Sequence, residues 1–193
     1  MPKVGMQPIR RQQLIDATLS TVNELGFADA SIQQIAQRAG VSTGIISHYF
    51  GGKNGLIEAT MRYLLQQLGE SVRDLKSEVG HSPEDRLMAI VKANFATPQT
   101  NQAAMKVWLA FWAISLHQPD LHRLQQVNHC RLHSNLKHEF LKRLSPLKAE
   151  QAAQGLAALI DGFWLRGALT RSEIDTDLSI RLCHAFIQQQ LTQ

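Results

Sequence analysis

The spacing of apolar residues is the strongest constraint on the fold of this 193-residue chain. Apolar side chains recur every three or four residues along almost the whole sequence, and no segment alternates apolar and polar residues convincingly. The first pattern places a stripe along one face of an α-helix, whereas alternation would indicate a β-strand. We therefore predict an all-α fold. With 44% hydrophobic residues, the chain is able to bury a sizeable core without disulfides or metals.

Helix start and stop signals divide the chain into about nine predicted helices. Glycine ends the first one, and proline at the first helical position opens several of the later ones. The predicted spans are residues 8–25, 31–39, 42–50, about 55–79, 83–97, 103–116, 119–144, 146–169 and 175–191. We expect a first domain at residues 1–54 and a second domain at residues 55–193.

Composition indicates a protein of the cytoplasm. The two cysteines, Cys130 and Cys183, have no metal-binding or redox spacing, which is typical of a reducing compartment. The start of the chain has no apolar stretch of signal-peptide length, and no run reaches the roughly 20 apolar residues of a membrane span. We therefore expect no membrane partner. A net charge of +4 permits nucleic-acid binding but does not by itself indicate it.

Residues 31–50 contain two short helical patterns that are hinged at Gly40. Ser31, with Gln34 three residues later, has the spacing of a capping box, and Ser42 is a candidate N-cap for the second helix. A glycine between them adopts a left-handed backbone at the lowest cost. Two short helices joined in this way are typical of a helix-turn-helix, whose second helix enters the major groove of DNA.

The second helix of this pair has one apolar and one polar side. Ile46 and Phe50 are predicted to face the core, which leaves small or hydrogen-bonding groups outside: Thr43, Gly44, Ser47 and His48. A recognition helix needs such groups because base edges must come within hydrogen-bonding distance. A helical hairpin with a merely solvated polar face is the alternative that this spacing leaves open.

The segment IQQIAQRAGVSTGIISHYFGGKNGL resembles the signature of TetR-type repressors. In that family a three-helix DNA-binding head precedes a ligand-binding, dimerising body, and the length of this chain and its all-helical remainder are similar. The resemblance implies double-stranded operator DNA and a second copy of the chain as partners. It also implies phosphate-side caps at Ser31 and Ser42, close approach to bases at Thr43 and Gly44, and DNA-backbone contacts at Tyr49 and Lys53, with Ser47 and His48 on the same surface.

Two positions depart from the family pattern. Ser47 stands where a tyrosine is common, and Asn54 stands where an acid is common after the lysine. The first departure leaves open whether position 47 contacts phosphate or base.

Three further stretches are similar to a choline-responsive branch of the family: STGIISHYFGGKNGLIEATMR, AAMKVWLAFWAISLHQPDLHRLQQV and GLAALIDGFWLRGAL. Members of that branch control the synthesis of glycine betaine from choline, a response to osmotic stress. The resemblance implies a repressor that choline, as effector, releases or modulates, with no cofactor. A TetR-type repressor that senses another hydrophobic or cationic small molecule is the alternative.

A choline site would have to recognise a quaternary ammonium group, which donates no hydrogen bond. Aromatic faces and a carboxylate can hold it, and each cation–π contact contributes about 0.5 to 2 kcal/mol. The candidates are Asn94, Trp108, Phe111, Trp112, Asp161 and Trp164. Aromatic residues at helical spacing can equally be ordinary core residues. Asp161 can equally be a structural acid paired with Arg166, because a lone buried carboxylate is costly.

An enzymatic function and a metal site find little support. The sequence shows no nucleophile–base–acid order, no phosphate-binding loop and no cluster of metal ligands. Five histidines lie within residues 117–138, and His129 and His133 have the i, i+4 spacing of a metal pair. Because no further ligand has a matching spacing, we predict a solvated helix face instead. A helical adaptor that does not bind DNA is the remaining alternative.

Overall fold

The computed structural model describes residues 6–170 and 174–192. These residues form ten α-helices and no strand, which confirms the predicted all-α fold. The helices are α1 (Met6–Leu25), α2 (Ile32–Arg38), α3 (Thr43–Phe50), α4 (Lys53–Glu78), α5 (Pro83–Asn94), α6 (Thr97–Thr100), α7 (Gln102–Ser115), α8 (Pro119–Phe140), α9 (Pro146–Leu169) and α10 (Thr176–Leu191).

Nine of these helices correspond to the predicted ones, and the differences lie at helix ends. α6 is an additional four-residue helix with Pro98 in its first turn, where proline was expected only to follow the end of a helix. Proline is compatible with both situations because it lacks only the amide that a first turn leaves free. α8 ends at Phe140, and residues 141–144 form turns instead of continuing the predicted helix to 144.

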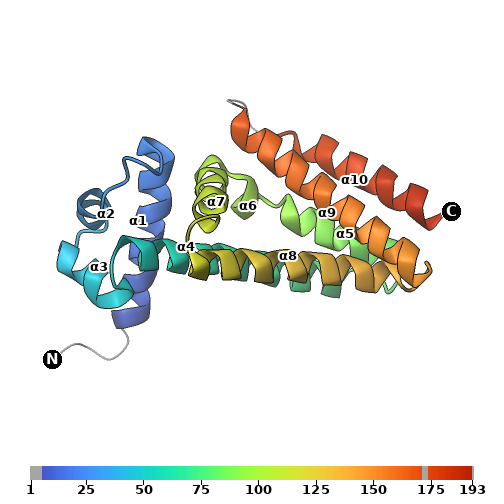
Figure 1. Ribbon diagram of the computed structural model, residues 1–193, viewed down its shortest axis with the longest axis horizontal. Coiled ribbons are helices and arrows are strands. Elements are labelled where there is room, and N and C mark those ends of the chain that lie inside the picture. The colour runs from blue at the N-terminus through green and yellow to red at the C-terminus, as the bar shows by residue number, and fades with distance from the viewer. Residues whose placement is uncertain (1–5, 171–173, 193) are drawn as a thin grey trace.

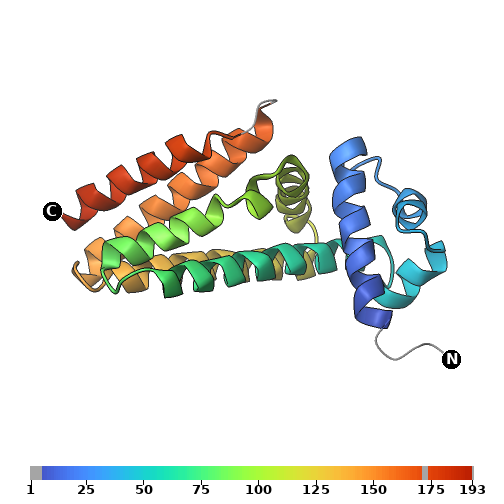
Figure 2. The same cartoon turned by 180° about the vertical axis from the view of Figure 1, so that it is seen from behind.

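The helices form a small head and a longer body (Figure 1). α1, α2 and α3 lie together at one end, and α4 runs from the head along the body (Figure 2). α8 lies beside α4, while α9 and α10 lie on the other side of the body, with α10 at its edge. α7 lies between α1 and the rest of the body, and it packs against α1. In the described ranges, no helix is both long and apolar enough to cross a bilayer.

Two hydrophobic clusters meet on α4. The smaller one lies in the head and contains Leu14, Ala17, Ile35, Ala36, Ile46 and Leu56. The larger one fills the body, begins on α4 with Ile57, and also includes Val22 of α1 and Ala30. The change of cluster therefore falls between two consecutive residues of one continuous helix. It supports a boundary close to residue 54, although the division at 54/55 stays a prediction.

Gly55 permits the close junction between α3 and α4. A β-carbon built at this position would lie 1.8 Å from the carbonyl oxygen of Phe50, the last residue of α3. No side chain fits at such a distance, so the backbone itself would have to move. The glycine therefore allows the start of α4 to lie close to the end of α3.

One buried carboxylate joins three helices at the far end of the body. The Glu139 side chain of α8 is 0% exposed and accepts hydrogen bonds from Lys76 of α4 at 2.8 Å and from Arg86 of α5 at 3.2 Å, with a third from Lys142. Burial by itself would raise the pKa of Glu139, but the hydrogen bonds from the three cations outweigh it and lower the pKa to about 2. Glu139 therefore stabilises the folded body as a carboxylate.

We expect Glu139→Gln to lower the free energy of unfolding at pH 7 by about 3 kcal/mol, because three cations lose their shared partner while the side-chain shape is kept. The folded-state pKa is lowered from 4.5 to about 2, so this stabilisation is present above pH 4.5 and is lost as the pH falls toward 2. Urea unfolding at pH 7 and pH 3 measures both effects. Glu78→Gln, an exposed change in the last turn of α4, is the matched control. An equal decrease in the free energy of unfolding in the two variants would contradict this role of Glu139.

Candidate DNA-binding surface and ligand cavity

The turn between α2 and α3 has the predicted geometry, with one exception. The Ser31 hydroxyl accepts a hydrogen bond from the amide of Gln34 at 3.2 Å, and the Gln34 side chain accepts one from the amide of Ser31 at 2.8 Å, which confirms the capping box. Gly40 is left-handed, with φ of 64°. Ser42 occupies the predicted N-cap position of α3, but its side chain makes no capping hydrogen bond.

The residues predicted to contact DNA lie along α3 and at the starts of α2 and α4. Five of them are exposed, namely Ser42, Thr43, Gly44, Ser47 and His48, and three are half-buried, namely Ser31, Tyr49 and Lys53. Behind this surface, Ile46 is fully buried in the hydrophobic cluster of the head. α3 thus presents one small, polar side from a rigid support, and the DNA contacts of the eight residues stay a prediction.

Arg11 of α1 holds the C-terminal end of α3. Its guanidinium donates a hydrogen bond to the carbonyl oxygen of Tyr49 at 2.8 Å and lies 4.5 Å from the centre of the Phe50 ring. No local sequence pattern predicts this role of Arg11, because its partners are distant in the chain. Arg11 therefore orients α3 relative to α1.

The first turns of α3 and α4 carry no acidic residue, and neither helix has a side-chain cap. Their free amides and aligned dipoles give each N-terminus a partial positive charge that favours phosphate groups. Lys53 adds a full charge at the start of α4, where its ammonium lies 5.0 Å from the centre of the Phe27 ring and 3.5 Å from the Phe27 carbonyl oxygen. Both helix ends are therefore suited to the DNA backbone.

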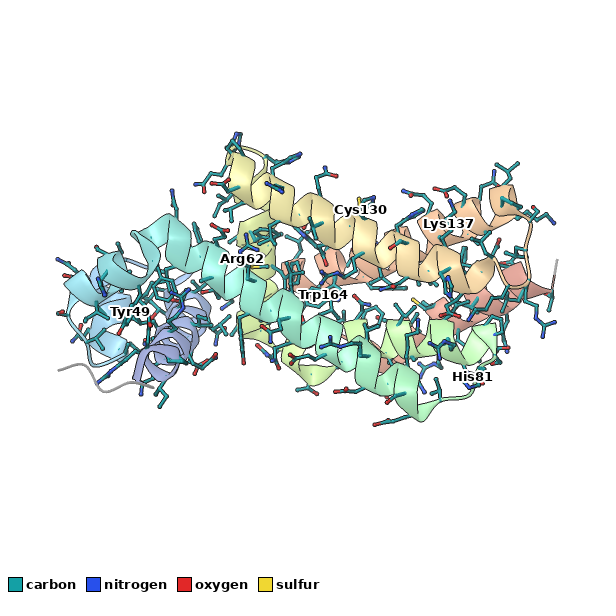
Figure 3. All side chains as sticks on the ribbon, turned by 90° about the horizontal axis from the view of Figure 1, so that it is seen from below. Tyr49, Arg62, His81, Cys130, Lys137 and Trp164 are labelled. Atoms are coloured by element: carbon teal, nitrogen blue, oxygen red, sulfur yellow. The ribbon has the colours of Figure 1, made fainter. Side chains whose placement is uncertain are left out.

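A cavity of about 1080 Å³ lies in the body, between α4 and α8. Figure 3 shows Trp164 of α9 in the gap between these two helices. Five of the six predicted ligand residues line the cavity: Asn94, Trp108, Trp112, Asp161 and Trp164. Phe111 is not among the lining residues, because it is fully buried and its ring packs edge-on against Trp108, with centroids 5.9 Å apart. The fold therefore brings α5, α7 and α9 together at one wall.

The three tryptophans form one continuous aromatic wall. The Trp108 ring lies 6.2 Å from Trp112 and 5.8 Å from Trp164, measured between centroids. The Trp164 indole donates a hydrogen bond to the carbonyl oxygen of Asn94 at 3.0 Å, which fixes its orientation. The indole N–H groups of Trp108 and Trp112 are buried without a hydrogen-bond partner among the described residues. Such tilted packing provides the aromatic surface that a cationic group requires.

Asp161 is the only acid among the described residues that line the cavity. Its side chain is accessible from the cavity, yet the surrounding protein raises the pKa of Asp161 by burial, while the nearby His129 acts in the opposite direction. No ion pair joins it to Arg166 or to another residue in the described part of the chain. The structural alternative for this carboxylate is therefore not observed, and a cationic ligand would favour its ionised form.

The histidine-rich segment 117–138, most of which lies in α8, is mostly exposed, as predicted for His117, His122, His129 and His138. His133 differs, because it is half-buried against α9 and its Nε2 lies 3.1 Å from the carboxylate of Glu150. This pairing depends on the packing of two helices and has no sequence signal. Among the described residues, no group of three or more potential ligands is arranged to hold a metal.

Family models match both parts of the chain. Residues 14–60 match the bacterial regulatory proteins of the tetR family, and residues 83–192 match the C-terminal domain of the BetI-type transcriptional repressor. The HTH-type transcriptional regulator BetI of Pectobacterium atrosepticum is 60% identical over 193 residues, which cover 100% of this chain and 99% of that protein. BetI 1 of Chromohalobacter salexigens is 53% identical over 193 residues, or 100% and 96% of the two chains.

Solved structures share the fold. A transcriptional regulator from Pseudomonas aeruginosa has a TM-score of 0.81 and 26% identity over 96% of this chain and 91% of its own. A regulator from Saccharomonospora viridis, solved in complex with choline, has a TM-score of 0.77 and 21% identity over 92% and 95% of the two chains. At that identity the second similarity shows the fold alone.

The helix-turn-helix head, the cavity-bearing body and the relatives lead to one conclusion. Both family models describe regulators of transcription, and the matched relatives extend over the whole length of the chain. Members of this family bind DNA and are not enzymes. The chain therefore belongs to the TetR family of transcriptional regulators, within its BetI-type branch.

Proposed function

We propose that this transcriptional repressor controls the genes that convert choline to glycine betaine, and that choline releases it from its operator. The observation that carries the proposal is the cavity between α4 and α8, which combines three indole rings with the carboxylate of Asp161. The regulator from Saccharomonospora viridis, which shares the fold, was solved in complex with choline, and this supports the same ligand.

The chemistry of the cavity matches a quaternary ammonium ion. Such an ion has no N–H group, so its recognition depends on aromatic surfaces and on charge, with about 0.5 to 2 kcal/mol for each aromatic contact. Trp108, Trp112 and Trp164 supply the aromatic surface, and Asp161 supplies the opposite charge. Asn94 positions Trp164 through its backbone carbonyl.

A repressor that senses a larger hydrophobic cation is the second candidate. The cavity of about 1080 Å³ is at the upper end of the roughly 300 to 1,000 Å³ that drug-sized ligands occupy, and choline is a much smaller molecule. Calorimetric titration with choline, betaine aldehyde and a cationic dye separates the two candidates, because only the second predicts tighter binding of the dye.

The ligand signal has two routes to the head. α4 begins under the head and lines the cavity along much of its length. α7 carries Trp108 and Trp112, packs against α1, and donates a hydrogen bond from Lys106 to the carbonyl oxygen of Asn23. We propose that choline favours an arrangement in which the two heads no longer fit their operator. A difference in affinity of about 1 to 3 kcal/mol between the two arrangements is sufficient.

We expect Lys53→Ala to weaken operator binding by about tenfold for every DNA sequence and to reduce the salt dependence by about one ion, because a phosphate contact is lost. Thr43→Val should instead weaken binding to the specific operator more than binding to unrelated DNA. Fluorescence anisotropy with duplexes from upstream of choline-oxidation genes, at several salt concentrations, measures both effects. Lys92→Ala, an exposed change on α5, is the matched control. A helical adaptor would show no DNA binding in any of these proteins.

We expect Asp161→Asn to weaken choline binding at neutral pH by tenfold or more, because the cation loses its counter-charge. Since burial raises the pKa of Asp161, choline binding to the unchanged protein should weaken as the pH falls through this raised pKa, and the variant should lose that dependence. Calorimetry at a series of pH values from neutral downward tests both points. Asp74→Asn, an exposed change on α4 outside the cavity lining, should behave like the unchanged protein. Unaltered choline affinity in Asp161→Asn would remove this carboxylate from the site.

We propose that α9 and α10 form a four-helix bundle with the same helices of a second copy. Five leucines on these helices are 41 to 69% exposed: Leu147, Leu165, Leu169, Leu178 and Leu182. An exposed apolar surface of this kind is typical of a protein interface.

Leu182→Glu should therefore produce monomers in analytical ultracentrifugation and weaken operator binding, since two linked heads bind a palindrome better than one. Leu116→Glu, at a 75% exposed position after α7, should leave the assembly unchanged. A dimer that tolerates Leu182→Glu would place the interface elsewhere.

A further inference from the structure

The cavity that contains Asp161 is also lined by five lysine and arginine side chains: Arg62, Arg73, Lys76, Arg86 and Arg131. Three of them have acidic partners. Lys76 and Arg86 bind the buried Glu139, and Arg62 pairs with Glu58 at 2.6 Å. Arg73 and Arg131 form no ion pair within residues 6–170 and 174–192. The lining therefore contains uncompensated positive charge in addition to one carboxylate.

The two unpaired arginines come from opposite sides of the gap between α4 and α8. The Arg131 guanidinium reaches from α8 to the surface of α4, where a β-carbon built on Gly69 would lie 3.9 Å from its Nη1 atom. Arg73 follows Gly69 by one helical turn, so the two positions share a face of α4. Asn128 and Asn135, which lie one turn to either side of Arg131 on α8, also line the cavity. Guanidinium and amide donors are therefore gathered along one stretch of the gap.

A ligand with only positive charge would gain nothing from this stretch. Coulomb repulsion from two uncompensated guanidinium groups would oppose its entry, whereas a carboxylate or phosphate would be attracted. Guanidinium groups also fit the oxygens of such anions with paired hydrogen bonds. The cavity of about 1080 Å³ leaves ample room for a second ligand group beside a trimethylammonium head.

We propose that the cavity recognises zwitterionic quaternary amines, with the ammonium head at the tryptophan wall and Asp161 and an anionic group at Arg131 and Arg73. The inference rests on the proposed function, because it takes the tryptophan wall as the ammonium site. The shared chemistry is a quaternary ammonium with an attached anion. That anion is a carboxylate in an oxidised choline derivative and a phosphate in a phosphorylated one.

Calorimetric titration of the full-length protein with choline, glycine betaine and phosphocholine tests the proposal. We expect at least one of the two zwitterions to bind the unchanged protein. Arg131→Gln should weaken the binding of that zwitterion by tenfold or more, while choline binds equally well or more tightly. The retained choline binding also shows that the variant is folded. Arg73→Gln should also weaken the binding of the zwitterion, by a smaller factor. Arg123→Gln, on the same helix but outside this lining, should change neither affinity.

The outcomes separate this inference from the proposed function. Two results would overturn the inference and leave the choline response intact. One is that choline binds and neither zwitterion does. The other is that Arg131→Gln lowers the affinities for choline and for the zwitterion equally. Zwitterion binding that depends on Arg131, without choline binding, would support the inference and remove choline as effector. Absence of binding for all three compounds would overturn both.

Discussion

The structure depends on α4, because this helix contributes residues to two hydrophobic cores. Leu56 is buried in the cluster of the head, and the next residue, Ile57, belongs to the cluster of the body. Adjacent residues of one helix cannot move independently, because the backbone hydrogen bonds fix their relative orientation. α4 therefore connects the two clusters without an intervening loop. Gly55 makes this junction as short as the backbone allows.

The cavity is lined by helices that also reach the head. α4 begins in the head, and α7, which carries Trp108 and Trp112, packs on α1. At the opposite end of the body, Glu139 ties α4 to α5 and α8 through three cations. Glu139 thus joins three helices at the end of the body that lies away from the head. This arrangement suits a protein whose ligand biases two packed states.

Local signals predicted most of the elements. Periodicity and caps located nine of the ten helices, and the left-handed Gly40 and the capping box at Ser31 follow from side-chain chemistry within a few residues. The three tryptophans predicted for the ligand site line one cavity, whereas Phe111, which helical spacing places beside them, lies behind Trp108. Arg11, Glu139 and the pairing of His133 with Glu150 escaped prediction because each depends on partners from another helix.

The sequence by itself determined the all-α fold, the helix-turn-helix and the residues available for a cation site, because these depend on spacing along a single helix or turn. Only the tertiary structure decided which of those residues share a cavity, and that unpaired arginines from α4 and α8 lie in the same cavity as Asp161. Helix periodicity specifies which side of a helix is apolar, but the position of one helix against another is set by side chains that meet only after packing.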